Sequence, residues 1–306
     1  MVEYEIISHE KIRGLHVFLN EIRMRSLHVH HDMEFLYVLK GQGDIRVKEK
    51  RFPVSSGDLI LINAFDPHEI SCMEEGILCI IIQISNHFLR EYYPPLRNII
   101  FSEMEIRSCF PEEDYSQLIR CIYDLAVSYS DQKEYFELSC VSHVSDILLR
   151  LLKYVPYSVL EESEYSKRKK LNQRFNRIVS YIEANYQDQI RLSDIAEKEE
   201  ITVTHLSHIC KDYFGMNFQE YLKKKRLEHA LRLLPDNSLS LSAIASASGF
   251  SELKYMNRAF EESFHMSPLS FRRKEETNKK KYTGSEPEHI YSSEEAVLFL
   301  QDHKNF

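Results

Sequence analysis

Apolar and polar residues alternate along the first part of the chain, from about residue 15 to residue 84, in short runs typical of β-strands. Turn-forming residues separate these runs, at positions 41–43, at Pro53 and at positions 57–58. One run, residues 77–84, is almost entirely apolar but is too short to cross a bilayer. Many short strands with regularly placed turns predict a β-sandwich or a small barrel.

The spacing of apolar residues changes to that of an α-helix after Pro111. Residues 114–130 and residues 135–155 each carry an apolar stripe at helical period, so we expect two helices that cover the strands. The polar stretch that follows, residues 161–173, has the composition of an interdomain linker.

A helix-turn-helix pattern occurs twice near the C-terminal end, at residues 190–215 and 239–264. Each copy has a short helix with an Ile-Ala pair, a few turn residues and a longer helix. Thr202 and Ser251 are expected to cap the two longer helices. Two helices joined by so tight a turn form the motif that places its second helix in the DNA major groove. The sequence therefore predicts a DNA-binding domain.

Polar residues of the longer helices fall on the stripe opposite the apolar one. Hydroxyl, imidazole, amide and guanidinium groups are able to read base edges. We therefore expect DNA contacts from Thr204, His205, Ser207, His208 and Lys211 in the first copy and from Lys254, Asn257 and Arg258 in the second. Glu261 is expected either to repel a phosphate or to hold Arg258 in position. The alternative is two solvated amphipathic helices that bind no ligand.

Charge is distributed unevenly over the 306 residues, whose net charge is −8. Residues 168–281 carry a net charge of +6 and the remainder −14. A basic module joined to an acidic one is expected where only one half meets phosphates.

The six cysteines have no CxxC spacing, and we expect them to be reduced and buried. The first residues carry charge where a signal peptide needs an apolar stretch. These features predict a soluble, cytoplasmic protein that does not contact a membrane.

Three segments, residues 181–196, 217–234 and 247–273, closely resemble the DNA-binding domain of AraC-type transcription regulators. This resemblance implies two helix-turn-helix units that are joined by a long helix at about 218–234 and enter successive major-groove segments. Cys210, Glu261 and His265 depart from the residues usual in the family, which are Phe, Lys and Gly. His265 stands where a left-handed turn is expected, a conformation that His tolerates better than most residues.

Residues 28–41 resemble the first motif of cupins, with His28, His30, Glu34 and Gly41 at its spacing, and Gly57 and His68 match part of the second motif. The resemblance implies a barrel that holds a small effector. We expect the effector to be bound by His28, His30, Glu34, Tyr37, Arg46 and His68.

Three imidazoles and one carboxylate are also suitable ligands for a divalent metal. Asn63, Phe65 and Cys72 depart from the second cupin motif, so we expect the four residues to be hydrogen-bond partners of a polar effector, with no metal and no cofactor.

Together these patterns predict an α+β protein, with an N-terminal cupin-like β-barrel and dimerisation helices followed by an all-α domain with two helix-turn-helix units. The expected parts are a barrel at 1–110, a helical dimerisation segment at 111–160, a linker at 161–172, a DNA-binding domain at 173–274 and a tail at 275–306. In the tail, Ser292 or Ser293 is expected to cap a short helix.

The family resemblance implies a sequence-specific transcription regulator, an activator and not an enzyme, that responds to a carbohydrate bound in the barrel. Its implied partners are double-stranded DNA, the effector, a second copy of the chain and RNA polymerase. One alternative is a metal-dependent cupin enzyme that carries a DNA-binding domain. Another is a regulator whose barrel is filled and binds no ligand.

Overall fold

The computed structural model describes residues 3–4, 9, 11–72, 76–214, 216–279 and 288–302. The chain divides into two compact units. The barrel unit comprises residues 5–171 and 287–306, and the helical unit comprises residues 1–4 and 172–286. The α+β class predicted from the sequence is confirmed, with the barrel strands in the first unit and the repeated helix-turn-helix motif in the second.

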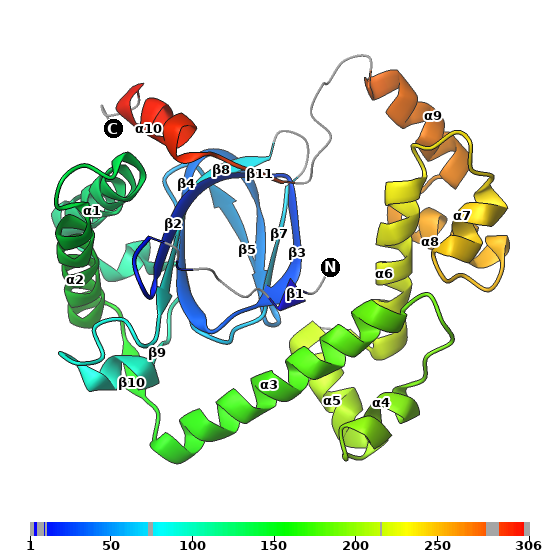
Figure 1. The fold of residues 1–306 in the computed structure, drawn as a ribbon, viewed down its shortest axis with the longest axis horizontal. Helices are drawn as coiled ribbons and strands as arrows, with labels where there is room; N and C mark the ends of the chain where they lie inside the picture. Colours follow the sequence, from blue (N-terminus) through cyan, green and yellow to red (C-terminus); the bar gives the residue numbers. More distant parts are fainter. Residues whose placement is uncertain are drawn as a thin grey trace. The chain divides into compact units, whose positions relative to one another are not determined.

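Antiparallel strands of the barrel unit curl into a nearly closed barrel, drawn in blue and cyan in Figure 1 except for β11 near the C-terminus. Their order is β3-β7-β4-β8-β2-β11, and β5 and β6 also pair with β4. The barrel strands are β2 (Leu15–Ile22), β3 (Met24–Val29), β4 (Asp32–Val47), β5 (Lys50–Ser55), β6 (Leu59–Ile62), β7 (His68–Ser71), β8 (Ile77–Ser85) and β11 (Glu288–Ile290). Strands β9 (Ile99–Phe101) and β10 (Tyr157–Val159) form a separate two-stranded sheet, and β1 (Glu3–Tyr4) is assigned to the helical unit.

Gly41 is the point at which the long strand β4 changes its partners. Before it β4 pairs with β8, and from Gln42 onward β4 pairs with β5. Gly41 has a φ of +92°, and a Cβ atom there would lie 2.2 Å from the carbonyl oxygen of Gly76. Only glycine fits this position, because it combines a left-handed backbone with a close approach of main chain. Gly41 thereby allows the single strand β4 to pair with β8 before this residue and with β5 after it.

The β2-β8-β4-β6 part of the barrel is covered on both faces. Its inner face contributes Leu36, Ile60 and Ile81 to the core inside the barrel. Its outer face contributes Phe35 and Ile82 to a second core that also contains buried residues of the helices. Burial on both faces explains why residues 77–84 read as one continuous apolar run rather than as an alternating one.

The two helices expected after Pro111 are present as α1 (Glu112–Asp131) and α2 (Phe136–Tyr154) and pack on the outer face of the barrel. Two short 3-10 helices, η1 (Pro94–Asn98) and η2 (Ile106–Cys109), precede them. Among the described residues, no helix has both the length and the apolar character required to cross a membrane.

The stretch expected to be a linker, residues 161–172, is helical almost throughout, and the two units divide between Leu171 and Asn172. Helix α3 (Glu162–Asn185) runs through it without a break. Tyr165 is buried, and its hydroxyl accepts a hydrogen bond of 2.7 Å from the Asn86 side chain. A solvated helix with few buried residues has the same polar composition as a linker, so composition did not distinguish the two.

The tail expected at 275–306 is not a separate part of the chain. Residues 287–306 belong to the barrel unit, where β11 pairs with β2 and α10 (Ser293–Asp302) packs on α1. Ala296 and Leu300 of α10 are buried in the outer core. Ser292 caps this helix as predicted, because its Oγ accepts a hydrogen bond of 3.3 Å from the Glu295 amide.

The helical unit contains the two predicted helix-turn-helix motifs, α4–α5 and α7–α8, joined by α6. Thr202 caps α5 as expected, with its Oγ1 3.1 Å from the His205 amide nitrogen. Ser251 does not cap α8, because the N-cap position is occupied by Glu252, whose side chain makes no capping hydrogen bond. His265 ends α8 in the predicted left-handed conformation. The helices are α4 (Leu192–Lys198), α5 (Val203–Phe214), α6 (Phe218–Leu233), α7 (Leu241–Ala247), α8 (Leu253–Phe264) and α9 (Pro268–Lys279).

Gly249 makes the turn between α7 and α8 possible. Its φ is +82°, and a Cβ atom would lie 2.6 Å from Cα of Gln187 and 2.7 Å from the carbonyl oxygen of Tyr186. The turn of the second motif therefore packs directly against the main chain that follows α3.

Candidate functional site

Helices α5 and α8 each bury one stripe and expose the opposite one. Leu206 and Ile209 of α5 and Met256 and Phe260 of α8 are buried. The residues predicted to contact DNA are all exposed, namely Thr204, His205, Ser207, His208, Lys211, Lys254, Asn257 and Arg258. The sequence therefore identified the solvent-facing side of both helices, and the side chains there are ones that recognise base edges and phosphates.

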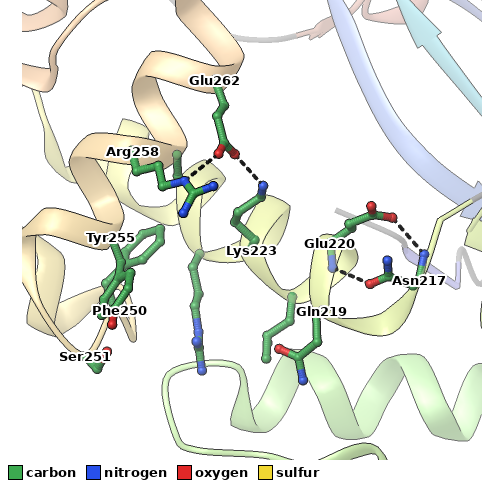
Figure 2. Close-up of a pocket in the computed structure, with 12 residues that line it drawn as sticks. Asn217, Gln219, Glu220, Lys223, Phe250, Ser251, Tyr255, Arg258 and Glu262 are labelled. Atoms are coloured by element: carbon green, nitrogen blue, oxygen red, sulfur yellow. Dashed lines mark hydrogen bonds and ion pairs between the residues drawn. The ribbon is translucent and has the colours of Figure 1, made fainter.

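Arg258 is held by Glu262 rather than by Glu261, which corrects the orienting role considered for Glu261. The Nε atom of Arg258 donates a hydrogen bond of 2.8 Å to Oε1 of Glu262. Lys223 of α6 donates a hydrogen bond of 2.7 Å to Oε2 of the same carboxylate. Figure 2 shows the Glu262 carboxylate between the two cationic side chains. The two hydrogen bonds and the positive charges lower the pKa of Glu262 below its ordinary value.

Three basic residues of the helical unit have structural contacts that sequence reasoning did not identify. Lys225 is buried and pairs with Glu183. Arg226 donates hydrogen bonds of 2.8 Å to the carbonyl oxygens of residues 186 and 188. Arg272 donates one of 2.7 Å to the carbonyl oxygen of Leu234. A run of lysine and arginine residues does not indicate which of them are buried, so the sequence alone could not predict these structural contacts.

Four predicted residues of the barrel converge at one buried point. The possible ligand atoms of His28, His30, Glu34 and His68 all lie within 4.8 Å of one another. Each of the four residues is at most 2% exposed. Strands β3, β4 and β7 position three of them, with His28 directly opposite His68 in the register and Glu34 on the inward face of β4, and His30 lies in the connection between β3 and β4. The spacing of the two cupin motifs was thus sufficient to find the cluster, with His28, His30 and Glu34 in the first motif and His68 in the second.

Two backbone carbonyls determine where two of these imidazoles carry a proton. His30 Nδ1 lies 2.9 Å from the carbonyl oxygen of Asp32, and His68 Nδ1 lies 2.9 Å from that of Asp66. A carbonyl oxygen only accepts hydrogen bonds, so each Nδ1 carries the proton. In their neutral forms both rings then direct an Nε2 lone pair toward the carboxylate of Glu34.

The Nε2 atoms of His30 and His68 lie 3.1 and 3.4 Å from the two oxygens of Glu34. Lone pairs on nitrogen and oxygen repel each other at such distances unless a positively charged species, either a proton or a metal ion, lies between them.

Burial raises the pKa of Glu34, but contacts with His30 and His68 outweigh the effect of burial and hold the pKa well below its usual range. Burial, and then the neighbouring His68, hold the pKa of His28 well below 6.5. A carboxylate at Glu34 and a neutral imidazole at His28 are the forms in which these two side chains bind metals.

Tyr37 and Arg46 do not join the cluster, although both were predicted to bind the effector. Tyr37 packs against the outer core beneath the helices. Arg46 pairs across the strands with Glu69 at 2.8 Å, and its neighbours Ile45 and Val47 face the barrel interior instead. Both residues point away from the interior because side chains alternate along β4.

Gln83 is a member of the cluster that the sequence analysis missed. It is fully buried, lies opposite Glu34 in the register of β4 and β8, and donates a hydrogen bond of 2.8 Å to Glu34 Oε2. A single polar residue inside the apolar run 77–84 was the available signal.

Comparison with known families and proteins gives matches in both units. The family model described as a cupin domain matches residues 21–83, and that described as a helix-turn-helix domain matches residues 195–274.

An uncharacterized HTH-type transcriptional regulator of Staphylococcus aureus (strain MRSA252) is 24% identical over 277 residues, which cover 87% of this chain and 34% of that protein. The chain thus spans about a third of the length of the first such relatives. The Msm operon regulatory protein of Streptococcus mutans is 24% identical over 245 residues, with 79% of this chain and 84% of that protein covered. Among solved structures, the C-terminal domain of the two-component response regulator yesN from Fusobacterium nucleatum is 34% identical, covers 33% of this chain and 98% of that chain, and has a TM-score of 0.31.

Proposed function

Because this chain belongs to the AraC-type transcription regulators, with a cupin domain and a helix-turn-helix domain, we propose that it binds specific DNA sequences under the control of a ligand in the barrel. The observation that carries the proposal is the repeated motif whose two longer helices each expose a polar stripe over a buried apolar one. Both longer helices enter the major groove of double-stranded DNA.

Base recognition is assigned to Thr204, Ser207 and His208 of α5 and to Lys254, Asn257 and Arg258 of α8. His205 and Lys211, also exposed, add contacts to the DNA. The test is selection of bound duplexes from a random pool by the full-length protein, followed by measurement of binding as a function of salt. A regulator of this kind enriches a defined sequence and loses affinity steeply as salt rises, because phosphate contacts release counterions. A protein that enriches no sequence contradicts the proposal.

The effector is assigned to the buried cluster His28, His30, Glu34 and His68, and a carbohydrate is the proposed class because its hydroxyls pair with imidazole and carboxylate groups. Since the four side chains are almost completely buried, a sugar enters only when the barrel opens. A panel of sugars tested for an increase in the melting temperature checks this assignment, because a ligand of the native state stabilises it. His30→Ala removes the increase but leaves DNA binding in place.

A divalent metal ion is a second candidate ligand, favoured by the two imidazole Nε2 atoms that face the Glu34 carboxylate. The residues that would hold it are His28, His30, Glu34 and His68, a donor set suited to Fe, Ni, Mn or Zn. The ion would supply a fixed positive charge between β3, β4 and β7. Metal content is measured in protein purified without an affinity tag or added metal, and the melting temperature is measured with and without a chelator. Metal in stoichiometric amount that a chelator removes, with a lower melting temperature, supports this candidate.

A metal in the cluster also separates the regulator from its rival, a metal-dependent cupin enzyme with a DNA-binding domain. Metal-loaded protein that turns over a small substrate supports the enzyme. Metal or sugar that changes the affinity for DNA without any turnover supports the regulator.

A homodimer is proposed to form through α2. Leu138 and Leu149 of this helix are 72% and 66% exposed, and Ser142 and Ser145 lie between them on the same face. Large apolar side chains next to small ones suit the close approach of a second helix. Sedimentation of the wild type and of a Leu138→Glu/Leu149→Glu variant measures the oligomeric state and tests this interface.

The last part of the proposal is that the protein activates transcription through RNA polymerase in the cytoplasm. Transcription in vitro with purified polymerase tests this part.

A further inference from the structure

A three-residue ion-pair chain joins the helix proposed to read DNA to the helix that connects the two motifs. Glu262 accepts from Arg258 with one carboxylate oxygen and from Lys223 with the other. Arg258 and Glu262 are one helical turn apart on α8, whereas Lys223 belongs to α6. The three residues line a groove of about 450 Å³ between these helices, shown in Figure 2.

The atom of Arg258 that Glu262 contacts determines which part of the guanidinium remains available to a base. Glu262 contacts Nε, on the edge of the guanidinium nearest the aliphatic stem. The terminal amino groups Nη1 and Nη2 are the pair that donates two parallel hydrogen bonds to O6 and N7 of a guanine. A carboxylate on Nε therefore leaves the base-reading edge available and fixes the plane in which it lies.

Lys223 restrains the carboxylate itself. An exposed arginine and an exposed glutamate on one helix hold each other weakly, because both side chains rotate freely in water. The second hydrogen bond, from Lys223 on another helix, limits the positions that Glu262 adopts. The carboxylate also adds a negative charge close to where DNA phosphates would lie, which weakens attraction to DNA of any sequence.

We propose that Glu262 is a positioning residue that determines the sequence specificity of the second motif, by orienting Arg258 toward a base and by opposing non-specific contacts with phosphates. The proposal rests on the proposed function, in which Arg258 reads a base. Glu262 acts through Arg258 and does not itself contact the DNA bases.

Glu262→Gln tests the proposal, with Glu261→Gln as the matched control. Both variants of the full-length protein remove one negative charge from neighbouring exposed positions of α8, but only the first loses the carboxylate that holds Arg258 and Lys223. Affinity is measured for the selected duplex, for the same duplex with the base under Arg258 replaced, and for an unrelated duplex, at several salt concentrations. That base is the position at which Arg258→Ala relaxes the preference.

Glu262→Gln is expected to bind the unrelated duplex more tightly and to lose about tenfold of the discrimination at the base under Arg258, within the range that a bidentate arginine supplies. Glu261→Gln is expected to tighten non-specific binding alone and to retain the discrimination. Lys223→Met, which removes the contact from α6 but leaves Glu262, is expected to lower the discrimination without tightening non-specific binding.

Equal effects of Glu262→Gln and Glu261→Gln would overturn the positioning role, since charge alone would then explain both variants. In the Arg258→Ala background, Glu262→Gln is expected to cause no further loss of discrimination, and a further loss would also contradict the proposal. Failure of the proposed function looks different, because the wild-type protein would then select no sequence at all.

Discussion

The guanidinium of Arg168 is paired with the buried carboxylate of Asp66, two residues before His68 of the barrel cluster. Lys48 pairs with the same carboxylate at 2.8 Å, and the carbonyl oxygen of Asp66 accepts the hydrogen bond from His68 Nδ1. Arg168 belongs to α3, the helix that continues into the helical unit from Asn172 onward. The segment that positions a cluster residue is thus attached to the helix that connects the two units.

Arg168→Ala should separate ligand binding from its effect on DNA. The variant breaks the contact between α3 and Asp66 but leaves Lys48 to pair with that carboxylate, so we expect the barrel to fold and to bind its ligand. The change in DNA affinity on addition of the ligand should fall by a factor of several, since couplings of this kind amount to roughly 1–3 kcal/mol. The measurement is the DNA affinity of the variant with and without ligand, compared with that of the wild type.

Arg97→Ala is the control for this variant. Arg97 also pairs with a residue of α3, Glu162, but that contact does not involve the segment around Asp66. The control should retain the response to the ligand, and an equal loss in both variants would indicate that general anchoring of α3 matters instead.

Gly249→Ala should destabilise the helical unit. A left-handed backbone at a residue other than glycine costs about 1–3 kcal/mol, and the added Cβ would also collide with main-chain atoms of Tyr186 and Gln187. Urea denaturation should therefore show a lower free energy of unfolding and weaker DNA binding. Gly57→Ala has a similar φ of +94° but no atom within 4 Å of the new Cβ, so it isolates the cost of the backbone alone. A cost for Gly249→Ala no greater than that for Gly57→Ala would contradict the close packing of the turn.

Leu300→Ala should destabilise the barrel unit even though the residue lies far from the barrel in the sequence. Its side chain is 0% exposed in the outer core, and removal of a buried leucine costs about 2–5 kcal/mol. Leu298→Ala, on the same helix at 65% exposure, should change the free energy of unfolding by less than about 0.5 kcal/mol. Thermal denaturation of both variants tests whether α10 is packed in the outer core. A similar small effect of Leu300→Ala and Leu298→Ala would contradict that packing.

Native protein should react with a thiol reagent mainly at Cys72 and Cys109, the two cysteines that are not buried. Burial raises the pKa of Cys210 to about 12 and that of Cys72 to about 11, so the reactive thiolate is scarce at both near neutral pH. Cys72 should therefore react slowly and Cys210 only after unfolding. Mass spectrometry of labelled peptides checks the order, and rapid labelling of Cys210 in folded protein would argue against its place in the core.

The periodicity of apolar residues predicted which side of a helix or strand each side chain occupies. The exposed stripe around Arg258 follows from helical period, and the inward direction of Glu34 follows from strand period. The same strand period places Tyr37 on the opposite face from Glu34, because three positions separate them, and an explicit count would have removed Tyr37 from the candidate site.

Other features depend on contacts between distant residues, which a single sequence does not display. The pairing of β11 with β2 brings residues 288–290 beside residues 20–22, and neither segment carries a motif that identifies its partner. The hydrogen bond between Lys223 of α6 and Glu262 of α8 likewise joins residues more than thirty positions apart. For these features the physical cause is tertiary packing, and local propensity has little influence on them.

The return of residues 288–302 to the barrel unit has a consequence for the order in which this protein is made. A ribosome completes residues 172–286 before it adds β11 and α10, so the helical unit is available to fold while the barrel unit still lacks these two elements. Until then the edge of β2 has unpaired backbone groups and the site on α1 that receives Ala296 and Leu300 is uncovered. The helical unit is therefore complete in sequence before the barrel unit is, and the outer core of the barrel unit closes only once β11 and α10 have been added.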